Sequence, residues 1–292
     1  MDDSQVFQLK MGRKLGFAEY GAKDGYPVFY FHGYPGSRLE AGLMKDNWEC
    51  NDIHIVSVDR PGMGYSDHKP HRTILDQPDD IMELAVHLEL DRYGLLGISG
   101  GGPYALACAY KIPSEQITGC AVVSSSGPYY LTQEGLGKGE RTMLSLAKNV
   151  PLAFRFLLWL QLGRNVKREE WWEKNYTGMI AGAPEPDEWI LNEPRVRENI
   201  KAKTIEAFRQ GSKGLIDDFV LYSKDWGFEL NEIPAETKVS IYHGELDRNV
   251  PISIAKTISR QISHSEANFY PDEGHFSVYM NKFNDIIRSV TE

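Results

Sequence analysis

Glycine residues crowd around one serine in the stretch GLLGISGGGPYALACAY, residues 94–110. Glycine weakens both strands and helices, so a cluster of glycines indicates a backbone shape that other residues could not adopt. Residues 97–101 form the pattern G-x-S-x-G, with an apolar predicted strand before it and an alanine-rich predicted helix after it. Such a turn aims the serine hydroxyl out of the carboxyl end of the sheet, and the next amide lies at a helix N-terminus, where it can stabilise an oxyanion. The pattern therefore predicts that Ser99 is a nucleophile and that the Gly100 amide is one oxyanion donor.

A serine hydroxyl is a weak nucleophile and needs a base and, behind the base, an orienting carboxylate. His275, in the stretch EGHFSV, follows the last predicted strand and opens the last predicted helix. Its loop therefore lies at the carboxyl end of the predicted sheet, where a base for Ser99 has to lie. Asp247 comes shortly after the strand that ends near His243, and Glu245 is its rival two residues earlier. We predict that Ser99, Asp247 and His275 form the catalytic set.

The loop FHGYPGS, residues 31–37, is a glycine-punctuated turn from strand to helix and is expected to supply the second oxyanion donor. The donor is predicted to be the backbone N–H of Tyr34, because Pro35 has none to give. The Tyr34 ring is expected to line the pocket, and His32 is interpreted as a structural residue that holds the loop by hydrogen bonds. The histidines form no H-E-x-x-H pattern and the acidic residues no metal-type cluster, so no cofactor and no metal are expected.

The order of the predicted elements indicates the fold class. Alternating or β-branched runs predict strands at residues 5–10, 14–20, 28–32, 53–59, 94–98, 117–123, 238–243 and 267–270. Helical patterns occupy residues 37–51, 76–90, 100–111, 252–262 and 276–290. An early hairpin followed by alternating strands and helices predicts an α/β fold with a mostly parallel sheet and helices on both faces.

The stretch from residue 129 to 227 interrupts this alternation. It contains helical patterns, charged runs such as RNVKREEWWEK and a proline-and-acid cluster, AGAPEPDEW, but no convincing strand. We interpret it as a helical cap inserted over one end of the sheet, and residues 1–128 and 228–292 as the two parts of one core domain. The apolar stretch PLAFRFLLWLQL, residues 151–162, carries Arg155 and is too short to span a bilayer, so it is interpreted as a buried or lid helix.

Charge and cysteine content bear on partners and location. The net charge of −9 and the pI of about 5.5 argue against a nucleic-acid or anionic-membrane partner, and a small-molecule substrate is expected instead. The three cysteines, Cys50, Cys108 and Cys120, form no C-x-x-C pair, and the acidic N-terminus MDDSQVFQLK lacks the apolar core of a signal peptide. We therefore expect a cytoplasmic protein, either a monomer or a homodimer.

The stretches FHGYPGS, DRPGMGYSD, GISGGGPYALA, YHGELDRNVP and EGHFSV together give the chain a resemblance to the α/β-hydrolase superfamily over nearly its whole length. The chain order Ser, Asp, His also resembles that superfamily. The H-G-x-P loop is similar to that of a branch with capped esterases, epoxide hydrolases, haloalkane dehalogenases, cofactor-free haloperoxidases and proline iminopeptidases. This resemblance implies an eight-stranded sheet with an antiparallel second strand and a helical cap inserted after strand six.

Departures from these relatives narrow the expected activity. Epoxide hydrolases and haloalkane dehalogenases use an aspartate nucleophile, whereas this chain has Ser99 at that position. Proline iminopeptidases carry H-G-G-P-G and G-G-S-W-G, where this chain has HGYPGS and GISGGG. Many relatives have a larger side chain at the position of Gly100, so this glycine is expected to leave more room above the oxyanion hole.

The expected activity is that of a carboxylesterase-like serine hydrolase, which cleaves a small-to-medium apolar ester through an acyl-enzyme. Its pocket is expected to be lined by Tyr34, Phe154, Leu157, Trp159 and Phe276. The alternatives are a ligand-binding receptor with incidental hydrolysis, a proline iminopeptidase, a cofactor-free haloperoxidase and a C–C bond hydrolase. An exposed apolar patch on the cap would favour the receptor, and the charged run at residues 167–170 argues weakly against one.

Overall fold

One mixed sheet organises the chain. The computed structural model describes residues 2–44, 52–160 and 165–292. The sheet has eight strands in the order β1-β2-β4-β3-β5-β6-β7-β8. Their bounds are β1 Asp2–Gln8, β2 Lys14–Gly21, β3 Tyr26–Phe31, β4 Ile53–Val58, β5 Tyr93–Ile98, β6 Ile117–Val123, β7 Val239–Gly244 and β8 Glu266–Tyr270. β2 is antiparallel to β1 and β4, and the remaining neighbours are parallel, which confirms the expected fold class.

Helices that follow the strands cover the sheet. They are η1 Arg38–Met44, η2 Ile74–Asp76, α1 Gln77–His87, η3 Ser99–Gly101, α2 Gly102–Lys111, η4 Ser114–Gln116, η6 Leu230–Glu232, α9 Ile252–Gln261, α10 Ser277–Asn281 and α11 Phe283–Thr291. Two predicted helices differ from the observed ones. The helix predicted over residues 37–51 is the 3-10 helix η1, and residues 45–51 lie outside the described part of the chain. The helix predicted over residues 276–290 is divided into α10 and α11 at Lys282.

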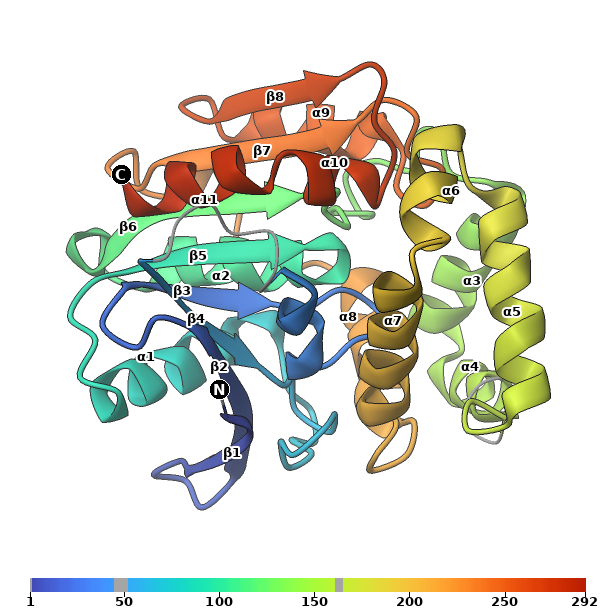
Figure 1. Cartoon of the computed structure of the whole chain (residues 1–292), viewed down its shortest axis with the longest axis horizontal. Coiled ribbons are helices and arrows are strands. Elements are labelled where there is room, and N and C mark those ends of the chain that lie inside the picture. The colour runs from blue at the N-terminus through green and yellow to red at the C-terminus, as the bar shows by residue number, and fades with distance from the viewer. Residues whose placement is uncertain (1, 45–51, 161–164) are drawn as a thin grey trace.

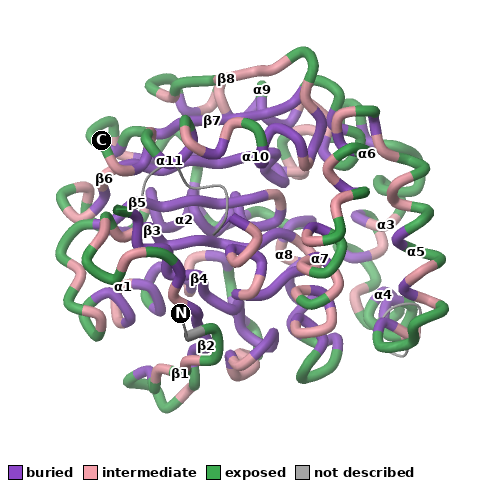
Figure 2. The backbone as a smooth tube through the Cα atoms, in the orientation of Figure 1, coloured by how far each residue is buried: buried purple, intermediate pink, exposed green. Residues whose placement is uncertain are grey.

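Burial on both faces explains the continuous apolar runs of the central strands. In β5, Leu95 packs in one core cluster with residues of α1, α2 and α9, whereas Leu96 packs in a second cluster with residues of α11. β6 alternates in the same way, with Val122 in the first cluster and Val123 in the second. Successive side chains of a strand point to opposite faces, so a strand between two helical layers has to be apolar throughout. The layers are visible in Figure 1, and the buried strands in Figure 2.

Residues 129–227, here called the helical segment, separate β6 from β7. Its helices are α3 Lys138–Asn149, α4 Pro151–Leu158, α5 Glu169–Gly182, α6 Glu185–Leu191, α7 Pro194–Ala207 and α8 Lys213–Tyr222. Figure 1 shows them gathered beyond the carboxyl ends of the parallel strands. Between β6 and β7 the described residues contain no strand, in keeping with the sequence pattern. The division of the chain at residues 128 and 228 into core and cap stays a prediction.

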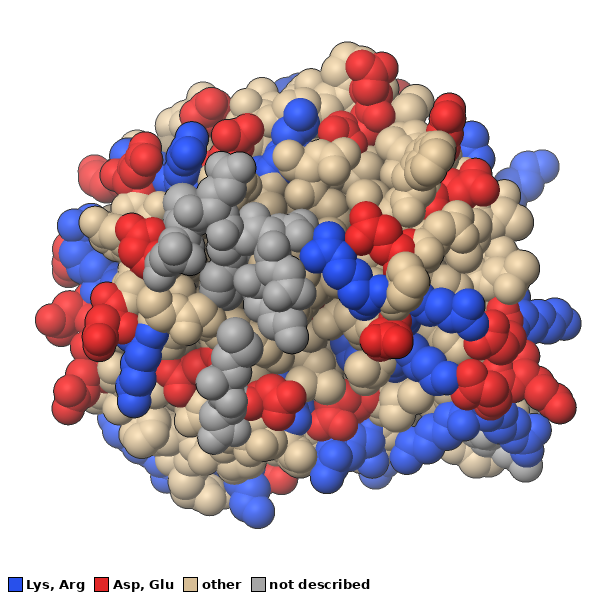
Figure 3. All heavy atoms as spheres, viewed as in Figure 1, with Lys and Arg blue, Asp and Glu red and all other residues tan. Residues whose placement is uncertain are grey.

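The surface carries charges of both signs. Acidic and basic side chains are interspersed over the face viewed in Figure 3, and the net charge of the whole chain is −9. In the part of the chain that the structure describes, no helix combines the length and the apolar character needed to cross a membrane.

Candidate active site

The glycine-rich turn holds Ser99 in an unusual backbone conformation. β5 ends at Ile98, and Ser99 has a φ of +50°, a backbone angle that residues other than glycine seldom adopt. A Cβ added to Gly97 would lie 2.8 Å from the Cβ of Ala105 in α2, and one added to Gly101 would collide with the Phe31 carbonyl at the end of β3. The glycines therefore let the turn approach both α2 and β3 closely, as the sequence pattern predicts.

His275 and Asp247 meet at the carboxyl end of the sheet. Their side chains are joined by a bond of 2.7 Å between His275 Nδ1 and Asp247 Oδ2, and both residues are buried. The other carboxylate oxygen of Asp247 accepts the backbone N–H groups of Asn249 and Val250, each at 2.8 Å. Glu245, the rival carboxylate, is exposed. The structure therefore pairs His275 with the predicted aspartate.

Burial and charge shift the pKa values of this pair in definite directions. Burial raises the pKa of the Asp247 carboxyl, but His275 and the backbone N–H donors lower it more, so the net shift is downward. Burial lowers the pKa of His275, whereas the Asp247 carboxylate raises it, and the net pKa lies above the usual 6.5. The imidazole is therefore a stronger base than a free imidazole, and it lies beside an ionised carboxylate.

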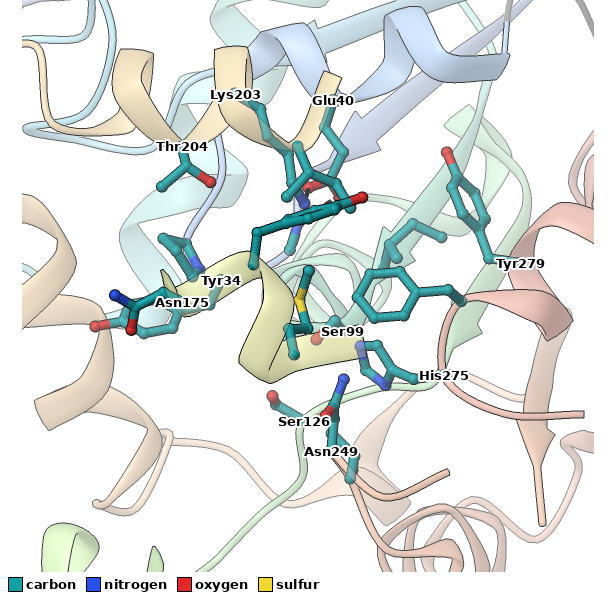
Figure 4. A pocket seen from close by; sticks show the side chains of 18 of the residues that line it. Tyr34, Glu40, Ser99, Ser126, Asn175, Lys203, Thr204, Asn249, His275 and Tyr279 are labelled. Atoms are coloured by element: carbon teal, nitrogen blue, oxygen red, sulfur yellow. Dashed lines mark hydrogen bonds and ion pairs between the residues drawn. The ribbon is translucent and has the colours of Figure 1, made fainter. Parts of the chain in front are cut away.

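Ser99 and His275 face the same cavity. The cavity has a volume of about 800 Å³, and both residues belong to its lining. Figure 4 shows their side chains next to each other, with Ser126 and Asn249 close by on one side. A proton could pass from a hydroxyl to an imidazole in such an arrangement once a substrate occupies the cavity.

The backbone around Ser99 holds two amides close together. A Cβ built on Gly100 would lie 3.3 Å from the backbone nitrogen of Tyr34, so the backbone at Gly100 lies close to that at Tyr34. The carbonyl oxygens of the Gly33–Tyr34 and Ser99–Gly100 peptide groups also accept hydrogen bonds. The Gly33 carbonyl accepts a bond of 2.9 Å from the Arg60 guanidinium, and the Ser99 carbonyl accepts one of 2.9 Å from the Ser126 N–H.

His32 lies under this loop and is fully buried. Its Nδ1 and the Gly33 carbonyl oxygen are 2.9 Å apart, and its Nε2 is 3.4 Å from the Arg60 backbone nitrogen. Burial, aided by the nearby Arg60 charge, lowers the pKa of His32 well below its usual value. A ring with this environment supports the loop in its neutral form, in keeping with the structural interpretation of His32.

Known proteins share this arrangement of elements. A model of the alpha/beta hydrolase fold family matches residues 26–281. The chain belongs to this family. Similarity to individual proteins is weaker: the bifunctional esterase/perhydrolase DCH of Acinetobacter calcoaceticus is 23% identical over 91% of both chains. A putative proline iminopeptidase of Mycoplasma pneumoniae is 32% identical, but over 39% of this chain and 38% of the relative. An esterase structure from Exiguobacterium antarcticum superposes with a TM-score of 0.71 at 20% identity, covering 98% of each chain.

The cavity lining of this alpha/beta hydrolase-fold protein corrects three predictions. Tyr34 and Phe276 line the cavity as expected, whereas Phe154, Leu157 and Trp159 do not belong to its lining. Phe154 is fully buried behind the wall, with its ring centroid 5.0 Å from that of Phe219. Leu157 and Trp159 are exposed on the outer surface. The apolar pattern of residues 151–162 shows that one face of α4 is buried, but it does not show which neighbour covers that face.

The expected space above Gly100 is filled, which is a further correction. A Cβ on Gly100 would lie 2.8 Å from the hydroxyl of Tyr222 and 2.7 Å from the Cβ of Tyr34. The Tyr222 hydroxyl, at the end of α8, donates a bond of 2.7 Å to the Gly100 carbonyl. Gly100 therefore makes room for a side chain of the helical segment rather than for substrate.

A buried charge cluster behind the oxyanion loop is absent from the sequence-based site. Asp218 in α8 accepts bonds from Arg60 (2.6 Å), Arg72, Tyr104 (2.7 Å) and Tyr222 (3.2 Å). Burial raises the pKa of Asp218, but the two guanidinium groups outweigh it and bring the pKa to about 2. The stretch DRPGMGYSD contains Arg60, so the motif marks one partner, but nothing in the sequence marks Asp218 as the other.

Lys203 in α7 is a second residue that the sequence did not reveal. It forms an ion pair with Glu40 of η1, and both residues line the cavity on the side opposite Asn249 (Figure 4). Glu40 also accepts the Gly33 N–H at 2.7 Å. No sequence pattern predicts a cation in the pocket, because Lys203 lies in an ordinary charged helix. Among the described residues, no group of three or more His, Cys, Asp or Glu side chains could hold a metal ion.

Proposed function

We propose that this member of the alpha/beta hydrolase fold family is a serine esterase of the carboxylesterase type, with Ser99 as nucleophile, His275 as base and Asp247 as the orienting carboxylate. The observation that carries the proposal is the 2.7 Å bond between His275 and Asp247 beside a serine held at a φ of +50°, with Ser99 and His275 lining one cavity. We also propose that the helical segment acts as the cap of this cavity.

The reaction begins when the Ser99 oxygen attacks the ester carbonyl and its proton passes to Nε2 of His275. The carbonyl oxygen becomes an oxyanion, which accepts hydrogen bonds from the Tyr34 and Gly100 amides. Each such donor is typically worth about 3 kcal/mol of transition-state stabilisation. The tetrahedral intermediate expels the alkoxide, which takes the proton from His275, and an acyl-serine remains. A water molecule, deprotonated by His275, then attacks the acyl carbon and releases the carboxylic acid and free Ser99.

The base has to be neutral in the resting enzyme, so the pKa of His275 sets the acid limb of activity. Because that pKa lies above 6.5, kcat/KM is expected to fall as the pH drops through a midpoint above 6.5. Below the midpoint the loss should be about tenfold per pH unit, as for a single ionisation. A midpoint below 6.5, measured with an ester that dissociates from the enzyme faster than it reacts, would contradict the assignment of His275 as the base.

Apolar side chains in the cavity support a small-to-medium apolar ester as substrate. They come mainly from the helical segment and the C-terminal helices, and include Leu43, Leu144, Trp172, Met179, Ile200 and Phe276. Lys203 is already paired with Glu40, so the cavity offers no unpaired net charge from this couple.

Hydrolysis of p-nitrophenyl acetate, butyrate and octanoate tests the proposal. We expect turnover, a burst of p-nitrophenol equal to the enzyme concentration with slowly deacylating esters, and loss of activity in Ser99→Ala. Ser145→Ala, which changes an exposed serine of α3, is the matched control. A fluorophosphonate label should be found on Ser99 by mass spectrometry. Wild-type protein without turnover, or Ser99→Ala with full turnover, would refute the esterase.

One observation favours a ligand-binding receptor as a second candidate. Leu152, Phe156 and Trp159 are exposed on or next to α4, at 81%, 58% and 44% of their surface, and such apolar patches can mark a protein contact. A receptor would bind an ester or lactone tightly and turn it over slowly. Turnover slower than about one per minute with Kd below about 1 μM would favour it over an enzyme with ordinary rates.

Peptide, peracid and C–C bond chemistry would use the same three residues on a different substrate. The partial similarity to a putative proline iminopeptidase supports a trial of proline p-nitroanilide, and the similarity to an esterase/perhydrolase supports a trial of acetic acid with hydrogen peroxide. A vinylogous 1,5-diketone tests C–C bond cleavage. We propose that each of these reactions is slower than ester hydrolysis, and a higher kcat/KM for any of them would replace the esterase assignment.

A further inference from the structure

Asp187 on α6 makes a contact with the histidine loop that the reaction above does not use. It is 2% exposed, and its carboxylate accepts three successive backbone N–H groups: His275 at 2.8 Å, Phe276 at 2.9 Å and Ser277 at 2.8 Å. These are the residues that lead from the last strand into α10. Hydrogen bonds to an ionised carboxylate are about twice as strong as those to a neutral acceptor. Asp187 therefore restrains the backbone of residues 275–277 more strongly than a neutral side chain would.

Because Gly274 has no side chain, the Asp187 carboxylate can lie directly against its backbone. A Cβ added to Gly274 would lie 2.5 Å from the Cγ of Asp187, well inside the closest approach of real side chains. The neighbouring Gly274 N–H is bonded to the hydroxyl of Ser277 at 2.7 Å, and the Ser124 hydroxyl donates to the His275 carbonyl at 3.3 Å. The loop that carries the imidazole is therefore fixed on several sides, and Asp187 supplies a charged support for its backbone.

We propose that Asp187 is a positioning residue for His275: it fixes the backbone that carries the imidazole, and it places a second negative charge near the ring. The inference rests on the proposed function, since it gives Asp187 a role in the work of the same base. Asp187 does not line the main cavity, so it acts through His275 rather than on the substrate.

The charges around His275 give the direction of the expected effect. Asp247, bonded to Nδ1, and Asp187 of α6 both raise its pKa, whereas burial and Lys203 of α7 lower it. His243, at the end of β7, lies 3.4 Å from Asp247, and burial lowers the pKa of His243 in spite of that carboxylate. Removal of the Asp187 charge should therefore lower the pKa of His275 and move the acid limb of activity to lower pH.

Asp187→Asn removes the charge and keeps one acceptor oxygen. We expect the acid midpoint of kcat/KM to fall by about 0.5 to 1 pH unit, a size typical of one carboxylate near a titrating ring. With the amide oxygen at the Oδ1 position, the bonds from Phe276 and Ser277 become neutral, and the bond from the His275 N–H to Oδ2 is lost. We therefore expect kcat to fall about tenfold while KM stays within about twofold. Asp217→Asn is the matched control: Asp217 is also buried and charged in the helical segment, but it binds His68 and Arg155.

The His275 ring is also titrated by NMR, with its signal assigned by its absence in His275→Gln. This measurement needs no turnover, so it separates the role of Asp187 from the esterase proposal. If the wild-type protein hydrolyses no ester, the proposed function fails, and the ring titration still tests Asp187. An unchanged His275 midpoint in a folded Asp187→Asn protein, or an equal shift in Asp217→Asn, would overturn the inference.

Gly274→Ala gives an independent variant in case Asp187→Asn does not fold. Its added methyl pushes the carboxylate away while all charges remain in the chain, so kcat and the His275 midpoint should both fall. In the double variant the two losses should be less than additive, because both act on one contact. Asp187→Glu keeps the charge on a longer arm and should lower kcat with little change in midpoint. Wild-type kcat and midpoint in Gly274→Ala would overturn the inference by themselves.

Discussion

The sheet and the helical segment contribute to the cavity in different ways. The sheet supplies the serine, aspartate and histidine from loops at the ends of parallel strands, and apolar packing on both faces holds those strands. The helical segment supplies charged side chains that reach back to the core: Asp187 binds the loop of His275, Lys203 pairs with Glu40 of η1, and Asp218 pairs with Arg60 after β4. Each meets the core close to a group that the reaction needs.

The two regions therefore depend on different forces. Apolar packing is tolerant of exchange between side chains of similar volume. A buried ion pair is not tolerant, because the loss of one partner leaves an uncompensated charge. The helical segment should therefore be more sensitive to single charge changes, and the sheet to changes at its loops and glycines.

We expect the greatest loss of activity from a change in a loop of the sheet. Asp247→Asn keeps the size of the side chain but favours the wrong tautomer of His275, so kcat should fall about 10⁴-fold. Glu245→Gln, two residues away and exposed, should stay within about twofold of the wild type, as most surface changes do. Steady-state kinetics with p-nitrophenyl butyrate checks both. Equal losses in the two variants would show that Asp247 is not the orienting carboxylate.

Asp218→Asn tests whether buried charge fastens the helical segment. The change leaves Arg60 and Arg72 without their carboxylate, and unfolding free energy should drop by about 3–5 kcal/mol. Urea denaturation measures it, with Asp272→Asn, at an exposed position, as the control. Because Arg60 holds the Gly33 carbonyl, activity should fall as well. A loss below about 1 kcal/mol would mean that apolar packing holds this segment in place too.

Phe154→Ala and Leu157→Ala separate packing within the helical segment from contact with substrate. Phe154 is fully buried, so its truncation should cost about 3–5 kcal/mol of unfolding free energy. Leu157 is 41% exposed, and its truncation should cost less than about 0.5 kcal/mol. KM for esters of different chain length should be unchanged in Leu157→Ala. A changed chain-length preference in Leu157→Ala would indicate that Leu157 contacts the substrate.

A smaller effect than that of Phe154→Ala is expected at the contact between α8 and the turn at Ser99. Tyr222→Phe removes the one hydroxyl hydrogen that the Gly100 carbonyl and, at a longer distance, Asp218 share. The loss of this buried hydrogen bond should cost about 1–2 kcal/mol of stability, with a loss of activity of similar size. Thermal melting and kcat/KM measure the two effects. An unchanged kcat/KM would show that this contact stabilises the fold without tuning the oxyanion site.

Much of the site could be predicted because its signals are local. Ser99 lies in a glycine turn whose shape only glycines permit, and His275 and Asp247 follow strands whose carboxyl ends share one edge of the sheet. The place of Tyr34 in the cavity lining was predictable for the same reason, since its loop leaves β3 at that edge. The eight strands were found because each is a short apolar or alternating run.

The sequence alone thus determined the fold class, the order of the strands along the chain and the residues at the strand ends. The tertiary structure decided which helices cover the cavity, why Phe154 packs behind the wall, and how Asp187 and Asp218 reach the core. The periodicity of apolar residues in the sequence indicates that a helix has a buried face, but it does not indicate which element covers that face. An aspartate in a helix looks the same in the sequence whether it faces solvent or holds a backbone more than 80 residues away.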